Sequence, residues 1–217
     1  MDFAARLRRA TMAEHREAET RSFISRLMSG DVPRAGFAAL TAQYLIIYRE
    51  LEAAAARMRA DGVAGPFADP ALDRVPALTA DLEHLYGPSW ATEVVPVEAT
   101  ARYAARLREH CHTSPAHFIA HHYVRYLGDL SGGQLVARRV ADTYGLSGEG
   151  LAFYRFEGIS DPKAYKTAYR ARLSALPYPA DQLAVLVAEA QLAFGLNAAI
   201  FADLAALYPD DDLAPAA

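Results

Sequence analysis

The chain lacks several features that would place a protein outside the reducing, aqueous interior of a cell. It has one cysteine, Cys111, so an internal disulfide is excluded. No uncharged apolar stretch is long enough to cross a membrane, and residues 1–9 carry charges where a secretory signal requires its apolar segment. These absences predict a soluble, cytoplasmic protein that has no membrane anchor.

An excess of positive charge is also missing. Lysine and arginine together number 22 against 26 aspartate and glutamate residues, which gives a formal net charge of −4. A nucleic-acid-binding domain carries a basic footprint. We therefore expect no nucleic-acid partner, and any cluster of cations must be local.

The alternation of apolar and polar residues that is typical of strands is absent, and apolar residues recur every three or four positions instead. This period predicts an all-α protein. Its length of 217 residues favours one domain, 1–217, over two. The expected helices cover residues 2–18, a short segment before 30–33, 37–58 with an end near 61–62, 78–86, 97–111, 115–144, 162–176 and 183–201.

Glycine is placed unusually in the segment Tyr126–Gln134, which holds three glycines and Asp129 inside what reads as one long helix. Each interior glycine costs about 1 kcal/mol relative to alanine, so the group needs a reason. Gly128 and Gly132 share a face at i, i+4 spacing. The pattern predicts a strip of bare backbone that lies against a flat, bulky object, with Asp129 over its edge.

His15 is the second informative residue. It shares a face of the first helix with Leu7 and Ala18, and we expect that face to point inward. Glu19, one turn later, could fix the imidazole tautomer as metal-bound histidines require, although a single histidine on a helix is more often merely packed. The other six histidines are interpreted as surface residues, including the pair His117 and His121, which lacks the glutamate and third ligand of a zinc site.

These motifs resemble the heme oxygenase family. The resemblance is carried by the glycine-aspartate run after Val124–Leu127 and by residues 7–19 around His15, and it continues through 44–52, 153–156, 163–170 and 193–197. It implies a single-domain, multi-helix fold that holds heme between two helices. The proximal helix would ligate iron through His15, and the kinked distal helix would contact the porphyrin at Gly128 and Gly132.

The resemblance also implies a distal network in which Asp129 acts through ordered water to deliver a proton to oxygen bound at the iron. Arg125, Tyr48 and Asn197 match further members of this network. The residues alone leave other interpretations open. Arg125 and Asp129 at i, i+4 spacing also fit a surface ion pair, and an asparagine on a helix seam often only sets register.

Heme carries two propionates, which a net-acidic protein must meet with local cations. The positions that match the propionate contacts of the family are Arg8, Tyr123, Lys166 and Arg170. A solvated helix face is the alternative for each of them. Phe194 and Met12 are expected to line the pocket or to belong to the ordinary core, and Met12 stands where several members of the family have a lysine.

The activity implied by the resemblance is the cleavage of heme to biliverdin, carbon monoxide and ferrous iron, with the IX-α isomer expected. Heme would be both cofactor and substrate. The reaction would consume O2 and electrons from a soluble ferredoxin, flavodoxin or reductase. The protein is expected to be a monomer. Two other classes remain open. A non-catalytic heme carrier or sensor would need His15 but not Asp129, and a thiaminase-like helical hydrolase would need Cys111 beside His112.

Overall fold

The computed structural model of the protein describes residues 2–19 and 22–210, apart from the side chains of Glu19 and Ser22. Within these ranges the chain is helical and contains no strand, so the all-α prediction is confirmed. The helices are α1 (Phe3–Ala10), α2 (Met12–Glu19), α3 (Ser22–Ser29), α4 (Arg34–Met58), α5 (Val75–Tyr86), α6 (Trp90–Glu93), α7 (Glu98–Arg106), α8 (Pro115–Asp129), α9 (Gly133–Tyr144), α10 (Pro162–Ser174) and α11 (Ala180–Leu207).

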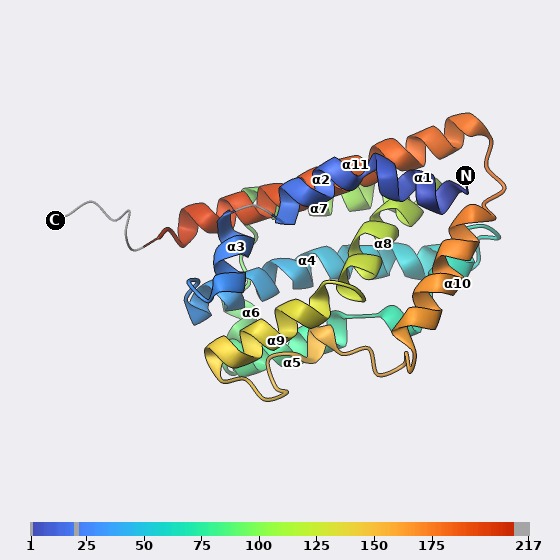
Figure 1. Ribbon diagram of the computed structural model, residues 1–217. Helices are drawn as coiled ribbons and strands as arrows, with labels where there is room; N and C mark the ends of the chain where they lie inside the picture. Colours follow the sequence, from blue (N-terminus) through green and yellow to red (C-terminus); the bar gives the residue numbers. More distant parts are fainter. Residues whose placement is uncertain (1, 20–21, 211–217) are drawn as a thin grey trace.

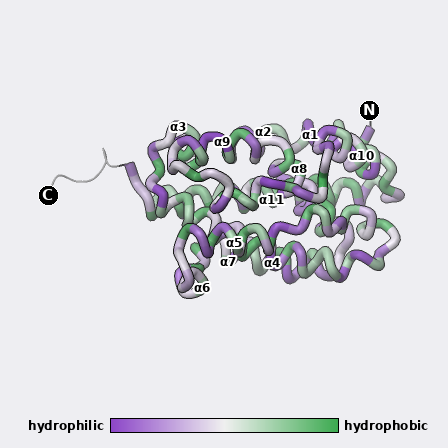
Figure 2. Tube along the Cα trace, turned by 90° about the horizontal axis from the view of Figure 1, so that it is seen from below, coloured by the Kyte–Doolittle hydropathy of each residue, from purple (hydrophilic) through white to green (hydrophobic). Residues whose placement is uncertain are grey.

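Helices α4 and α8 cross the middle of the molecule, and the long helix α11 runs along one side and contacts both (Figure 1). Helices α1 and α2 lie along α11, while α5 packs on the other side against α4. Helix α10 closes the end of the bundle beside α1. In the tube of Figure 2, hydrophobic and hydrophilic stretches alternate within the helices, which is the pattern of helices that bury one face.

The core is built from the apolar stripes that the sequence period predicts. On α4, Phe37, Leu40, Ile47 and Leu51 are each no more than 1% exposed. Helix α11 is, by length and composition, the one described helix that could cross a membrane. It contacts α8, α7 and α2, and a central helix of a bundle has the same composition.

Two of the predicted helices are each divided in two. The first breaks at Thr11, between α1 and α2, where the Thr11 hydroxyl donates to the carbonyl of Leu7 at 3.0 Å. The helix predicted over 115–144 is interrupted at residues 130–132, between α8 and α9. The periodicity missed both breaks because the apolar spacing continues across them.

The segment after α7 winds into a π-helical turn at Leu107–Cys111, which the sequence period does not distinguish from an α-helix. The connections also contain single 3₁₀ turns at Gly65–Phe67, Pro70–Leu72 and Ala152–Tyr154.

Candidate active site

The break between α8 and α9 presents bare backbone. The carbonyl of Gly128 accepts hydrogen bonds from the backbone N–H groups of Ser131 at 3.1 Å and Gly132 at 2.8 Å, which turns the chain out of α8. Gly128 and Gly132 have negative φ, so the turn does not require glycine. A Cβ added to Gly128 would meet nothing within 4 Å, and one added to Gly132 would meet only the Gly128 carbonyl at 3.8 Å. What these glycines provide is a surface without side chains, which fits a flat ligand.

Lys166 of α10 holds this break from the side. Its Nζ donates to the carbonyl of Leu130 at 3.0 Å and to Oγ of Ser131 at 3.1 Å. The ammonium group therefore satisfies a carbonyl that the end of α8 leaves without a helical partner. Lys166 thus lies next to the glycines.

Asp129 belongs to a chain of polar contacts that joins three helices. The hydroxyl of Tyr48 on α4 donates to Oδ2 of Asp129. On α8, Arg125 donates from Nε to the Tyr48 hydroxyl at 3.3 Å and from Nη1 to Oδ1 of Asn197 on α11 at 2.5 Å. The four side chains that the sequence analysis grouped are therefore brought together.

Arg125 is not part of a surface ion pair with Asp129, so that interpretation is wrong. Its side chain is buried, with 5% of the residue exposed, and its guanidinium carbon lies 4.5 Å and 5.0 Å from the ring centres of Tyr44 and Tyr48. The spacing of Arg125 and Asp129 placed them on one helix, but the packing of α4 and α11 over α8 removes the arginine from solvent.

Burial controls the electrostatics of this network. It raises the pKa of Asp129, while the positive charge of Arg125 and the hydrogen bond from Tyr48 act in the lowering direction. Burial also raises the pKa of Tyr48, so its hydroxyl stays protonated and can donate. The Nη2 atom of Arg125 is buried and donates to no described group. Such a donor calls for an acceptor that the protein itself does not supply.

His15 lies in the first turns of α2, and its side chain is exposed. The face that it shares with Leu7 and Ala18 does point inward, since these residues are 0% and 6% exposed, but His15 itself is not covered by the bundle. The imidazole has its edge against the ring of Phe194, with centroids 5.5 Å apart and an interplanar angle of 69°. The side chain of Glu19 lies outside the described part of the structure, so its contact with His15 stays a prediction.

Helix α11 connects the two sides of this region. Phe194 contacts His15 of α2, and Asn197, nearly one turn later, binds Arg125 of α8. The seam that the sequence period predicts on α11 therefore carries both contacts. The exposed imidazole of His15 and the buried polar network of Arg125 therefore both contact α11.

Three of the predicted propionate contacts lie close together where α1, α8 and α10 meet. Tyr123 of α8 is partly buried, and burial raises its pKa. A hydrogen bond with Thr11 and the positive charges of Arg170 and Arg8 act in the opposite direction. Met12, which follows Thr11, is 39% exposed. The structure thus brings Arg8 and Arg170 near enough to Tyr123 for both positive charges to act on its hydroxyl.

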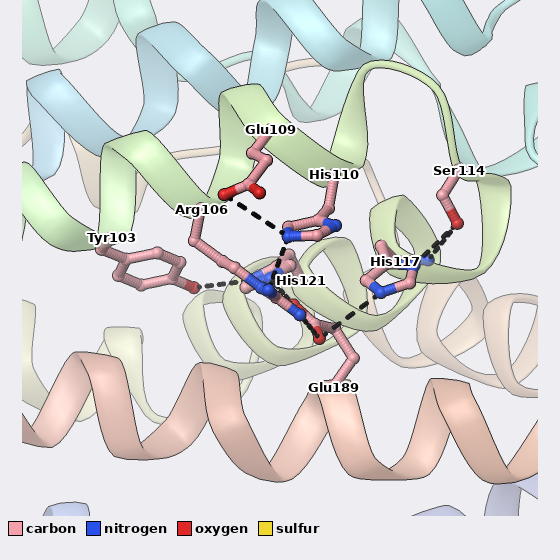
Figure 3. A network of polar contacts seen from close by, with 8 residues as sticks. All are labelled: Tyr103, Arg106, Glu109, His110, Ser114, His117, His121 and Glu189. Carbon is pink, nitrogen blue, oxygen red and sulfur yellow. Dashed lines mark hydrogen bonds and ion pairs between the residues drawn. The ribbon is translucent and has the colours of Figure 1, made fainter.

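A second polar network, centred on Glu189 of α11, was missed by the sequence analysis (Figure 3). Arg106 of α7 donates to both carboxylate oxygens, at 3.0 Å and 2.7 Å. His121 of α8 donates from Nε2 to Glu189 Oε1 at 2.8 Å, and its Nδ1 lies 3.2 Å from the hydroxyl of Tyr103. The sequence carries no signal for this network because its members come from three helices. His121 of this network lies one turn before Arg125 on α8, and both networks link α8 to α11.

The sequence analysis predicted that the six histidines other than His15 lie on the surface, and this prediction is wrong for two of them. His121 and His122 are 0% and 1% exposed. Burial lowers the pKa of both imidazoles, which keeps them neutral inside the bundle. His117 is partly buried and stacks on His110, with ring centroids 5.1 Å apart.

Cys111 does not have the setting of a nucleophile. It is 0% exposed in the π-helical turn, and burial raises the pKa of its thiol. A nucleophilic cysteine is a thiolate in an accessible, electropositive site. The geometry therefore argues against the hydrolase that would depend on Cys111.

Comparison with known proteins identifies the family. The family model described as heme oxygenase matches residues 1–203. Heme oxygenase of Rhodella violacea is 36% identical over 204 residues, which are 94% of this chain and 87% of that protein. Heme oxygenase 1 of Homo sapiens is 38% identical over 214 residues, which are 97% of this chain and 74% of that protein.

Solved structures agree with this result. Heme oxygenase-1 of the cyanobacterium Synechocystis in complex with heme has a TM-score of 0.91 and 32% identity, with 95% of this chain and 94% of that chain covered. Heme oxygenase of Leptospira interrogans has a TM-score of 0.88 and 35% identity, with 93% and 98% covered. The chain therefore belongs to the heme oxygenase family, whose activity is the cleavage of heme to biliverdin with O2 and a reductant.

Proposed function

We propose that this heme oxygenase binds heme between α2 and the break after α8, with His15 as the axial ligand of the iron. The support is the exposed imidazole held against Phe194 and the bare backbone at Gly128 and Gly132. Bound heme supplies the iron at which O2 is activated, and its ring is the group that is cleaved. Glu19 would hold the second nitrogen of the His15 imidazole.

Asp129 would hold the proton that the reaction consumes, and it would pass that proton on through water. The observation that carries this proposal is the chain from Asp129 through Tyr48 and Arg125 to Asn197, which leaves Arg125 Nη2 buried without an acceptor. A water molecule bound to that atom would complete the network. Tyr48 and Asn197 fix Asp129 and Arg125, and Gly128 and Gly132 keep side chains away from the porphyrin face.

The orientation of heme would be set by its propionates. The positive charges of Arg8 and Arg170 both act on Tyr123, and Lys166 lies one turn before Arg170 on α10. Met12 and Phe194 would line the adjacent apolar part of the pocket. These contacts would fix which edge of the ring faces Asp129. We propose the usual outcome of the family, biliverdin IX-α, as the product, together with carbon monoxide and ferrous iron.

We further propose that residues 1–217 act as one cytoplasmic domain and as a monomer. Electrons would come from a soluble ferredoxin, flavodoxin or reductase. The exposed cations Arg8 and Arg170 support an acidic donor at that edge, and a single buried cysteine suits a reducing compartment. Light scattering of the purified protein tests the monomer, and single-turnover reduction with each donor class tests the donor.

The experiment that tests the site combines hemin binding with product analysis. His15→Ala should remove the nitrogen-ligated heme spectrum and most turnover, whereas His84→Ala, on the far helix α5, should change neither. Asp129→Ala should take up hemin normally but yield much less biliverdin by chromatography. An unaltered heme spectrum in His15→Ala would refute the assignment of the ligand, and a normal biliverdin yield in Asp129→Ala would refute the role of that carboxylate. Hemin uptake without conversion by the unmodified protein would favour the carrier.

A further inference from the structure

The junction between α1 and α2 determines where His15 lies. Helix α1 ends at Ala10 and α2 begins at Met12, with Thr11 between them. The backbone N–H of His15 donates to the carbonyl of Thr11 at 3.0 Å, so His15 closes the first turn after the break. Any bend at Thr11 therefore moves the imidazole relative to the rest of the bundle.

Apolar packing secures α2 only weakly. Of residues 12–18, Ala18 alone is buried, Glu14 is partly buried and the others are exposed. Burial of apolar side chains is the main source of helix stability in a folded protein, and an eight-residue helix is marginal without it. The polar contacts of α2 with its neighbours therefore matter more than in the long helices.

One side chain bridges the junction from α11. The Nε2 atom of Gln191 donates to the carbonyl of Ala10 at 2.9 Å and to Oε1 of Glu14 at 2.9 Å. The first contact lies before the break at Thr11 and the second lies after it, next to His15. Oε2 of Glu14 is buried without a hydrogen-bond partner, and Oε1 accepts the hydrogen bond from Gln191.

Gln191 also stands in line with the contacts already described. Phe194 follows it by three residues on α11 and has its ring against His15, and Asn197 follows by three more and binds Arg125. Residues three positions apart are neighbours on the helix surface, so the three side chains form a continuous oblique strip along α11. This strip of α11 therefore contacts both α2 and the distal arginine.

We propose that Gln191 is a positioning residue for His15. By fixing Ala10 and Glu14 to α11, its amide holds the angle between α1 and α2 and with it the height and tilt of the imidazole. The proposal rests on the proposed role of His15 as the heme ligand. Gln191 itself touches no reacting group.

The test replaces the amide without changing the length of the side chain. Gln191→Met removes both donors, and Gln182→Met makes the same change at an exposed position on the first turn of α11. We expect Gln191→Met to raise the dissociation constant of hemin about tenfold, since a hydrogen bond to a charged group is lost. We also expect the iron–histidine stretching band of the reduced heme complex, measured by resonance Raman spectroscopy, to shift or broaden. Gln182→Met should leave both unchanged.

A second measurement does not depend on heme. In the protein without hemin, Gln191→Met should accelerate amide hydrogen exchange in residues 12–18, while exchange in the Arg125 region of α8 stays as in the unmodified protein. Gln191→Glu retains the shape of the side chain but presents a carboxylate to Glu14 and to the Ala10 carbonyl. It should show the same changes, and it replaces the methionine variant in the test if that variant folds poorly.

The two proposals fail in different ways. If His15→Ala leaves the heme spectrum unaltered, the ligand assignment is wrong. If His15→Ala abolishes nitrogen ligation while the Gln191 variants keep the Raman band, the hemin affinity and the exchange rates of the unmodified protein, then the role of Gln191 is refuted and that of His15 stands.

Discussion

Removing the hydroxyl of Tyr48 probes the distal network most directly. The ring is 0% exposed and packs edge-on against Tyr126 and Phe153, with centroids 5.5 Å and 5.4 Å away. Tyr48→Phe leaves these contacts in place and deletes one oxygen. Asp129 then loses a donor, and Nε of Arg125 loses its acceptor.

The expected cost follows from the charges involved. Hydrogen bonds to charged groups contribute about 1.5–3 kcal/mol, and burial prevents water from replacing the hydroxyl freely. We expect the free energy of unfolding at pH 8 to fall by about 2 kcal/mol. For a domain of this size that corresponds to a decrease in Tm of about 4–8 °C.

The cost should depend on pH in a defined direction. Burial raises the pKa of Asp129 in the folded protein, and the hydrogen bond from Tyr48 opposes that shift, so the substitution raises the pKa further. The unfolded pKa is the same in both proteins. When Asp129 is protonated in the folded state, the cost of losing a hydrogen bond to its charged carboxylate disappears. The difference in stability between the two proteins should therefore be largest at high pH and should narrow as the pH falls through the raised pKa of Asp129.

Urea unfolding of the protein without heme, followed by circular dichroism from pH 8 to pH 5, measures this difference. Tyr144→Phe is the matched control, because it loses a neutral hydrogen bond to the carbonyl of Val32 at 2.6 Å. It should cost about 1 kcal/mol at every pH. A difference for Tyr48→Phe below about 0.5 kcal/mol, the range of ordinary surface substitutions, would refute the argument. A difference that stays constant with pH would refute its link to Asp129.

Three further predictions concern other parts of the molecule. Gly128→Ala should stabilise the protein without heme by about 0.5–1 kcal/mol, because the added Cβ meets open space. The same substitution should weaken hemin binding measured by titration. Equal or tighter binding would contradict the proposal that heme lies against bare backbone at Gly128. Glu189→Leu should cost about 3–5 kcal/mol in urea unfolding, since Arg106 and His121 lose their buried carboxylate, and a cost under 1 kcal/mol would contradict it. Cys111 should react with a thiol reagent only in denaturant, because its thiol is buried and its pKa is raised, and rapid labelling of the folded protein would count against this.

The helical period of the sequence was sufficient for most of the fold. The long apolar stripes of α4 and α11 were predicted because their residues repeat at helical spacing over many turns. The helical period predicted neither the break at Thr11 nor the one at residues 130–132, since each depends on a few hydrogen bonds that leave the spacing unchanged. The second was expected only as the kink that the family resemblance implies. The π-helical turn at Leu107–Cys111 was missed for the same reason.

For the site, the sequence singled out Gly128, Asp129 and His15 because each breaks a local expectation or carries unusual chemistry. It could not find Glu189 or Gln191, which look like ordinary polar residues on α11. Their partners, His121 and Glu14, are separated from them by 68 and 177 positions in the chain.

The amino-acid sequence alone thus predicted the helical fold and the position of the glycine-bearing segment, because both depend on residues within a few positions of one another in the chain. The burial of Arg125, the exposure of His15 and the polar contacts along α11 depend on which helices pack together. The packing of α4, α8 and α11 determines which charged groups are buried and which hydrogen-bond donors have no acceptor in the protein. Neither can be determined before these helices are in contact.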